Sequence, residues 1–291
     1  MPALKALRDA HPRARIEILG YPHIAIIADK RFYADAVRSI EYGPLSRFFA
    51  RDAELPLDLR NYFGGFDLIL SYLYDPDQIF EINLRRSGAQ KFLRGPARII
   101  PGTPAARQLA QPLQEVGINV SDLAAKVFPS NKDREFAHRF LEEDCEPPIL
   151  ALHPGSGSEK KNWPIENWIE LAKASLNAEA LFRTIIFVSG EADEKEMARL
   201  RTLFEHEAHV RFAHQLPLPQ LAAVLDQSTF IGHDSGISHL AAAAGARCLI
   251  LFGPTDPEVW APQNKDVCVL LAANNDLRQL DVATVRKTVC L

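Results

Sequence analysis

The chain has 291 residues, 47% of them hydrophobic and 24% charged, a composition typical of a folded globular protein. This length predicts two domains, and the net charge of −4 argues against a nucleic-acid-binding protein. No apolar run approaches the roughly 18 residues that cross a bilayer, the N-terminus lacks the apolar core of a signal peptide, and the four cysteines form no CxxC pair. We therefore expect a cytoplasmic protein, soluble or peripheral to a membrane.

Residues 1–146 are predicted to form a first α/β domain. Strands are predicted near residues 15–19 and 67–72, and helices near residues 2–10 and 103–116. The acidic segment LEEDCEPP follows and ends in two prolines, which fix φ and lack an amide donor. Because such a segment is typical of a linker, we place the domain boundary between residues 146 and 147.

Residues 147–291 alternate strand and helix patterns more clearly. Strands are predicted at 149–152, 184–189, 210–212, 229–232 and 247–252, and helices at 165–174, 193–204, 219–226 and 236–244. Continuous apolar strands that alternate with helices indicate a parallel sheet covered on both faces.

Polar or glycine-rich loops follow four of these predicted strands. They read LHPGSGSEKKNWP (152–164), VSGEADE (188–194), GHDSGISH (232–239) and FGPTDP (252–257). Ligands of open α/β sheets bind beyond the carboxyl ends of the strands. The sequence therefore predicts a ligand site where these four loops meet.

The loop GHDSGISH leads into a helix and is suited to an anion such as pyrophosphate. A helix N-terminus exposes unpaired amides and the positive end of its dipole. Asp234 or Ser235 can cap this helix, Gly236 lets a ligand approach the backbone, and His239 lies one turn further on. The alternative is a plain capping motif with a buried histidine.

The loops after the first two strands add further candidates. Ser156 and Ser158 offer hydroxyls, and Lys161 offers a point charge for phosphate. Glu191 or Asp193 can hold ribose hydroxyls, although an acidic N-cap would have the same sequence. The pattern is neither a P-loop nor GxGxxG, and no histidine cluster has the spacing of a metal site.

Over residues 149–262, these motifs and their order resemble glycosyltransferase family 9, the ADP-heptose:lipopolysaccharide heptosyltransferases. The resemblance implies the α/β GT-B fold, in which two Rossmann-like domains with parallel sheets face an interdomain cleft. It also implies an inverting transfer of heptose from ADP-heptose to a lipopolysaccharide core or related glycan. Since the sequence has no evident metal site, we expect no metal and no cofactor. The alternatives are a GT-B transferase with another nucleotide sugar, and a nucleotide-sugar-binding paralogue without catalysis.

The resemblance also assigns roles to residues of the second domain. Lys161 matches the family lysine before the Trp-Pro pair, which contacts donor phosphate, and Leu216 falls where the family contacts adenine. Ser156 or Ser158 matches a phosphate-binding hydroxyl, and Glu191 or Asp193 matches the ribose-binding acid. The family motif D-[ST]-G-x-x-H is matched by Asp234, Ser235, Gly236 and His239.

The first domain departs from the family pattern. Family members open with a strand and a Gly-Asp loop that carries the presumed general base, whereas this chain opens on the following helix, MPALKALRDA. The missing strand is central in the family sheet, so its absence predicts two rows of unpaired backbone groups. Two interpretations stay open, a start codon upstream of Met1 or an inactive paralogue; Asp75 and Asp77 are weak candidates for a substitute base.

The acceptor is expected to be an anionic glycolipid or glycan bound by the first domain. The segment NLRRSGAQKFLRGPAR, residues 83–98, is basic, and Arg85 and Arg86 are its first two cations. The alternative is an ordinary solvated face. An acceptor of this kind would place the protein in the cytoplasm at the inner face of the inner membrane.

Overall fold

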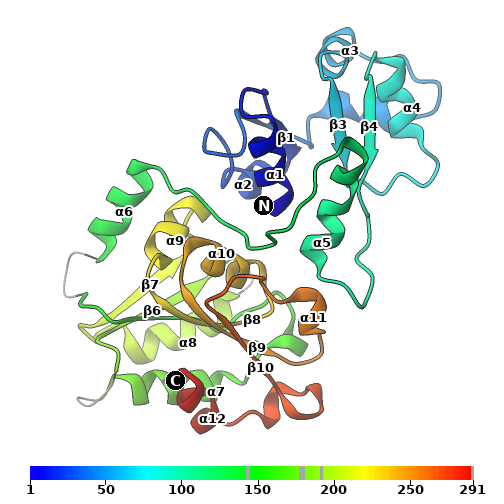
Figure 1. Ribbon diagram of the computed structural model, residues 1–291. Helices are drawn as coiled ribbons and strands as arrows, with labels where there is room; N and C mark the ends of the chain where they lie inside the picture. Colours follow the sequence, from blue (N-terminus) through cyan, green and yellow to red (C-terminus); the bar gives the residue numbers. More distant parts are fainter. Residues whose placement is uncertain (142–144, 177–180, 191–192, 290–291) are drawn as a thin grey trace. The chain divides into compact units, whose positions relative to one another are not determined.

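The computed structural model describes residues 1–141, 145–176, 181–190 and 193–289. The chain forms two compact units, Met1–Leu123 and Ala124–Leu291 (Figure 1). We call them the first and the second unit and describe each by itself.

The second unit contains one parallel sheet of six strands in the order β10-β9-β8-β5-β6-β7. The strands are β5 (Ile149–His153), β6 (Thr184–Ser189), β7 (Val210–His214), β8 (Thr229–His233), β9 (Arg247–Phe252) and β10 (Val267–Leu271). Counted along the chain, this order is 6-5-4-1-2-3, the doubly wound order of a Rossmann fold. The direction of winding switches between β5 and β8, the position where such sheets bind ligands.

Helices cover both faces of this sheet. Figure 1 shows α7, α8 and α12 on one face and α9 and α10 on the other. The helices are α6 (Asn131–Leu141), α7 (Ile165–Ser175), α8 (Glu194–Phe204), α9 (Leu218–Leu225), α10 (Gly236–Ala244), α11 (Pro257–Trp260) and α12 (Val282–Val289), and the 3₁₀ turns are η3 (Glu159–Lys161), η5 (Ala273–Asn275) and η6 (Leu277–Gln279). Every residue of β6 is buried, because a central parallel strand packs against helices on both sides.

The five strands predicted in the second half are confirmed as β5 to β9, and the four predicted helices as α7 to α10. The edge strand β10 was not predicted. None of its five residues is fully buried, and partly buried and exposed positions do not alternate regularly, so its sequence, VCVLL, resembles neither a buried strand nor a regular amphipathic one.

The first unit contains two separate parallel sheets of two strands each. The strands are β1 (Glu17–Gly20), β2 (Ala36–Ser39), β3 (Leu68–Ser71) and β4 (Lys91–Arg94); the helices are α1 (Pro2–Ala10), α2 (Pro22–Ala25), α3 (Leu57–Gly64), α4 (Ile79–Arg86) and α5 (Ala105–Ala110), with 3₁₀ turns η1 (Gly43–Phe49) and η2 (Gln111–Val116). In the described part of this unit, β1 pairs only with β2 and β3 only with β4. One side of each of β1 and β3 is therefore left without a neighbouring strand.

The two units divide upstream of the predicted boundary at residue 146. Residues 131–141, on the first-domain side of that boundary, form helix α6, which was not predicted and packs against α9 of the second unit. The Pro-Pro segment accordingly connects α6 to β5 within the second unit, rather than connecting the two units.

Candidate functional site

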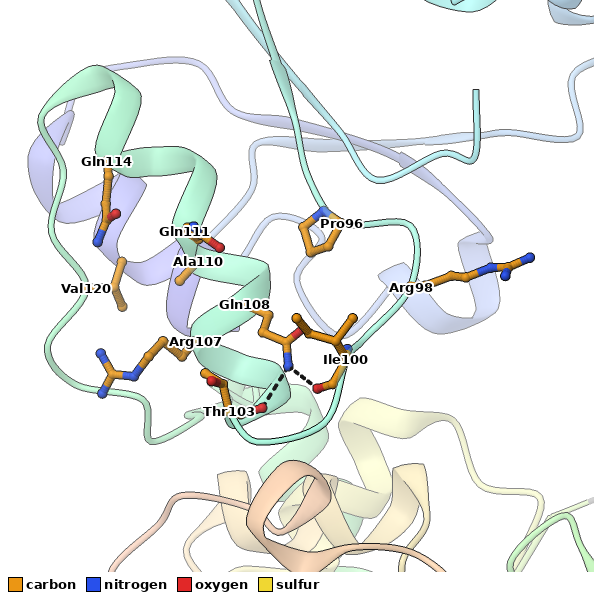
Figure 2. Close-up of a pocket in the computed structure, with 10 residues that line it drawn as sticks. All are labelled: Pro96, Arg98, Ile100, Thr103, Arg107, Gln108, Ala110, Gln111, Gln114 and Val120. Carbon is orange, nitrogen blue, oxygen red and sulfur yellow. Dashed lines mark hydrogen bonds between the residues drawn. The ribbon is translucent and has the colours of Figure 1, made fainter. Parts of the chain in front are cut away.

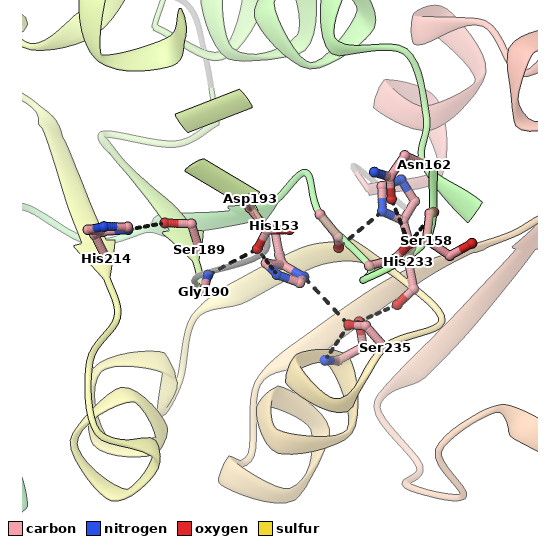
Figure 3. A network of polar contacts seen from close by, with 12 residues as sticks. His153, Ser158, Asn162, Ser189, Gly190, Asp193, His214, His233 and Ser235 are labelled. Carbon is pink, nitrogen blue, oxygen red and sulfur yellow. Dashed lines mark hydrogen bonds and ion pairs between the residues drawn. The ribbon is translucent and has the colours of Figure 1, made fainter. Parts of the chain in front are cut away.

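The candidate site lies at the carboxyl edge of the six-stranded sheet. The four polar loops follow β5, β6, β8 and β9, which are four contiguous strands of that sheet. Figure 3 shows the polar side chains from the first three of these loops in one connected network. The predicted convergence of the loops therefore has its physical basis in the strand order.

Helix α10 offers unpaired amides at this edge. Ser235 is its N-cap, and its Oγ accepts a hydrogen bond from the Ser238 amide at 3.3 Å, so Ser235 rather than Asp234 fills the capping role. Gly236, the first helical residue, is exposed, and a Cβ placed on it would meet no protein atom within 4 Å. Since packing does not demand a glycine here, the open space is available to a ligand at the helix N-terminus.

An ion pair joins the loop after β5 to the loop after β8. Lys161 Nζ lies 2.8 Å from Asp234 Oδ2, and the two side chains are 30% and 10% exposed. An ammonium group has three donors, so the pair leaves hydrogen atoms of Lys161 free to bind an anion beside α10.

The two predicted serines lie on the same loop as Lys161. Ser156 Oγ lies 2.6 Å from Asn162 Oδ1 and 3.0 Å from the Ser158 carbonyl oxygen. Ser158 is exposed and precedes η3, where its carbonyl accepts the Lys161 amide at 2.9 Å. Ser156 thus braces the loop from within, and Ser158 is an exposed residue of the same loop.

Asp193 faces the protein interior. Its Oδ2 accepts the Gly190 amide at 3.0 Å and lies 3.5 Å from His153 Nε2. Burial raises the pKa of this carboxyl, but the hydrogen bonds from His153 and Gly190 outweigh it and hold the pKa below 3.8. The carboxylate is therefore ionised and engaged with protein groups. Glu191, the alternative ribose ligand, lies outside the described residues.

Three histidines of this network were not predicted from the sequence. His153 ends β5 and is 3% exposed, His233 ends β8 and is fully buried, and His214 Nδ1 lies 2.8 Å from Ser189 Oγ. The only sequence signal was their position, since each is the last residue of its strand. Burial, with His153 close by, lowers the pKa of His233 to about 3.

The low pKa of His233 predicts a loss of stability in acid. Between pH 6.5 and about 3, the unfolded chain binds a proton that folded His233 excludes. The free energy of unfolding then falls with falling pH by up to about 1.4 kcal/mol per pH unit from this group. Urea unfolding of wild type and His233→Gln across this range should give a steeper decline in wild type; parallel declines would contradict the assignment.

His239 and Leu216 complete the predicted donor residues. His239 is half-buried in the first turn of α10, and burial lowers its pKa below the usual 6.5, so it is neutral at neutral pH. A neutral imidazole has one N–H donor, and the ring of His239 hydrogen-bonds the backbone of Trp260. Leu216 is half-buried in the connection between β7 and α9.

The two candidate bases of the first unit have structural partners. Asp75 accepts the amides of Phe80 and Glu81 at 3.2 and 3.0 Å, and so caps the first turn of α4. The exposed Asp77 lies 3.6 Å from an Arg51 guanidinium nitrogen. Each carboxylate therefore already has a protein partner, and neither is free to take a proton from an acceptor without losing it.

The candidate acceptor arginines differ in their surroundings. Arg85 pairs with the buried Glu81 at 2.8 Å, and Arg94 binds the same carboxylate. Arg86 donates to Asn83 Oδ1 at 2.8 Å and lines a cavity of about 580 Å³ together with Arg47 and Arg60. Arg86 thus lies at a cavity whose lining holds three arginines and one acid, Glu54, and Arg85 shares a single carboxylate with Arg94.

A second hollow of the first unit, of about 440 Å³, lies beside α5 and η2 (Figure 2). Arg98 and Arg107 contribute charge to its wall, and Gln111 and Gln114 contribute amides. Gln108 holds the wall together through hydrogen bonds to Ile100 and Thr103.

Among the residues that the structure describes, no group of three or more His, Cys, Asp or Glu could hold a metal ion. No described helix is long and apolar enough to cross a membrane.

The family model of glycosyltransferase family 9 (heptosyltransferase) matches residues 105–289, more than half of the chain. The chain belongs to glycosyltransferase family 9. The resemblance drawn from the loop motifs is thereby confirmed, and the match includes every donor residue predicted from them.

Curated relatives of this family 9 protein are lipopolysaccharide heptosyltransferases. Heptosyltransferase 1 of Escherichia coli O18:K1:H7 is 33% identical over 132 residues, which are 45% of this chain and 39% of the relative. Heptosyltransferase 2 of Salmonella typhimurium is 27% identical over 187 residues, 62% of this chain and 50% of the relative. The chain therefore matches half or less of the length of these two relatives.

Solved structures show the fold. A family 9 glycosyltransferase from Veillonella parvula matches with a TM-score of 0.76 at 16% identity and covers 99% of this chain and 91% of its own. E. coli heptosyltransferase WaaC with ADP matches with a TM-score of 0.70 at 19% identity and covers 99% and 93%. The predicted GT-B fold with parallel sheets is confirmed.

Proposed function

We propose that this family 9 protein is an inverting heptosyltransferase that moves heptose from ADP-heptose to a hydroxyl of a lipopolysaccharide core or related glycan. One observation carries the proposal: the open N-terminus of α10 lies beside Lys161, which Asp234 holds in place at 2.8 Å. This arrangement offers amides and an ammonium group to a diphosphate. The similar structure of WaaC with ADP supports a nucleotide at such a site.

The reaction would be a direct displacement at the anomeric carbon of the donor sugar. The acceptor oxygen forms the new bond while the bond to the diphosphate breaks, and the acceptor proton passes to a base. Charge that develops on the departing diphosphate would be stabilised by Lys161 and by the first amides of α10. These residues require no metal ion for this role.

We propose that Leu216 contacts the nucleobase and that Ser156 or Ser158 reaches the phosphates. Because the Asp193 carboxylate is engaged with His153 and Gly190, Glu191 is the better of the two ribose candidates.

A second function, donor binding without catalysis, has a specific observation in its favour. Asp75 is occupied in capping α4, and Asp77 lies beside Arg51. Neither weak candidate is therefore placed as a base.

A transfer assay tests the proposed function. Purified protein, ADP-heptose and a heptose-deficient lipopolysaccharide core are incubated together, and the products are analysed by mass spectrometry. We expect the acceptor to gain the mass of one heptose residue and ADP to be released. Donor binding without this gain supports the binding function, and a gain only with a different nucleotide sugar supports another GT-B transferase.

We expect Arg86 to be the main arginine that binds the negative charge of the acceptor. We expect Arg86→Gln to raise the KM for an anionic acceptor and to flatten its dependence on salt, because screening weakens contacts between exposed charges. Arg85→Gln is the matched control, since the Arg85 guanidinium is held by the buried Glu81 carboxylate. Equal effects of the two substitutions, or none, would support the interpretation of this segment as a solvated face.

An anionic glycolipid acceptor is membrane-anchored, so we expect the enzyme to act at the cytoplasmic face of the inner membrane.

A further inference from the structure

One buried side chain contacts both ends of the loop that carries Lys161. His233 Nε2 accepts the Trp163 amide hydrogen at 2.8 Å, and its Nδ1 lies 3.4 Å from the Gly155 carbonyl oxygen. The Trp168 ring packs edge-on against the imidazole, with ring centroids 5.3 Å apart. Figure 3 shows His233 within the polar network below this loop.

These two contacts fix the tautomer of His233. Since Nε2 accepts a hydrogen bond, its lone pair is free of a proton, and the neutral ring carries its hydrogen on Nδ1. Nδ1–H then donates to the Gly155 carbonyl. A protonated imidazolium would lose the acceptor for the Trp163 amide, and this buried amide would be left without a partner.

Two consecutive residues therefore restrain the same loop in different ways. His233 holds the backbone at Gly155 and Trp163, and Asp234 holds the Lys161 side chain. The bonds at Gly155 and Trp163 flank the segment that bears the ammonium group, so a shift of either end moves Lys161 relative to α10.

We propose that His233 is a positioning residue, whose neutral Nδ1–H imidazole fixes residues 155–163 so that Lys161 meets the diphosphate of the bound donor. The inference rests on the proposed donor site and adds to it a residue that does not touch the donor. A histidine that merely filled the core would stabilise the fold without acting through Lys161.

A double-mutant cycle separates these two roles. ADP affinity is measured by calorimetry for wild type, His233→Asn, Lys161→Ala and the double variant. His233→Gln is the conservative variant, since its Oε1 can accept the Trp163 amide, and His206→Asn is the matched control at a side chain that is 95% exposed. Thermal melts establish that each variant is folded.

We expect His233→Asn to weaken ADP binding at least fivefold, His233→Gln to recover most of it, and His206→Asn to match wild type. In the Lys161→Ala background the effect of His233→Asn should fall below twofold, because a misplaced loop no longer carries the ammonium group. An unchanged affinity of His233→Asn, or the same factor in both backgrounds, would overturn the inference.

A measurement on the wild-type protein covers the case in which the variants do not fold. The ¹⁵N chemical shifts of the His233 ring should report the neutral Nδ1–H tautomer from pH 5 to 8. An Nε2–H tautomer, or a ring that titrates in that range, would overturn the inference. Wild type that shows this tautomer but does not bind ADP would instead contradict the proposed donor function.

Discussion

Replacing Lys161 by alanine is expected to weaken ADP binding by about ten- to hundredfold. A hydrogen bond to a charged group contributes about 1.5–3 kcal/mol, and each 1.4 kcal/mol is about tenfold in Kd. Lys161 is only 30% exposed and is held beside the N-terminus of α10, so no other described lysine of this loop can substitute for it without a change in the loop.

Lys160 provides the matched control for this prediction. It is adjacent in η3 and exposed, so Lys160→Ala removes the same charge from the loop without touching the pair with Asp234. We expect Lys160→Ala to bind ADP nearly as wild type does, and Asp234→Ala to weaken binding because Lys161 loses its support. If Lys161→Ala and Asp234→Ala both keep the wild-type affinity by calorimetry, the diphosphate site is assigned wrongly.

Two glycines of the site should respond to alanine in opposite ways. A Cβ on Gly155 would lie 1.7 Å from Asp193 Oδ1, whereas a Cβ on Gly236 would meet nothing within 4 Å. Gly155→Ala is therefore expected to cost about 1–3 kcal/mol of stability or more by overpacking, several degrees in Tm. Gly236→Ala should leave Tm unchanged or slightly higher, since alanine is the better helix former.

ADP affinity is the second readout for these glycines. If the space at Gly236 belongs to the ligand, Gly236→Ala should weaken ADP binding although the fold is intact. Thermal melts and calorimetry on the two variants and wild type test both statements. A Gly155→Ala protein as stable as wild type would contradict the packing of Asp193, and a Gly236→Ala protein with wild-type affinity would contradict a ligand at that position.

The sequence was most informative where a strand is buried on both faces. The run TIIFVS of β6 has four consecutive apolar residues and is entirely buried, so composition alone indicates a central parallel strand. In the first unit, β2 (AVRS) and β4 (KFLR) are four residues long and half polar. Such strands form because a neighbouring strand pairs with them. The sequence of the strand itself does not show which segment that neighbour will be.

The candidate site was predictable in its location and less so in its internal bonds. The helix-opening motif with Gly236 follows from local chemistry, because capping and amide exposure depend on adjacent residues. The inward orientation of Asp193 depends instead on the space above Gly155 and on His153. These residues belong to different strands and loops, so only the packed sheet brings them together.

Calorimetric titration of the wild-type protein with ADP tests the central claim most directly. We expect one binding site per chain with a Kd between the low-micromolar and the millimolar range, and a clearly weaker response to UDP and GDP at equal concentration. A folded protein that shows no heat of binding with millimolar ADP, or that binds UDP or GDP as tightly as ADP, would contradict it.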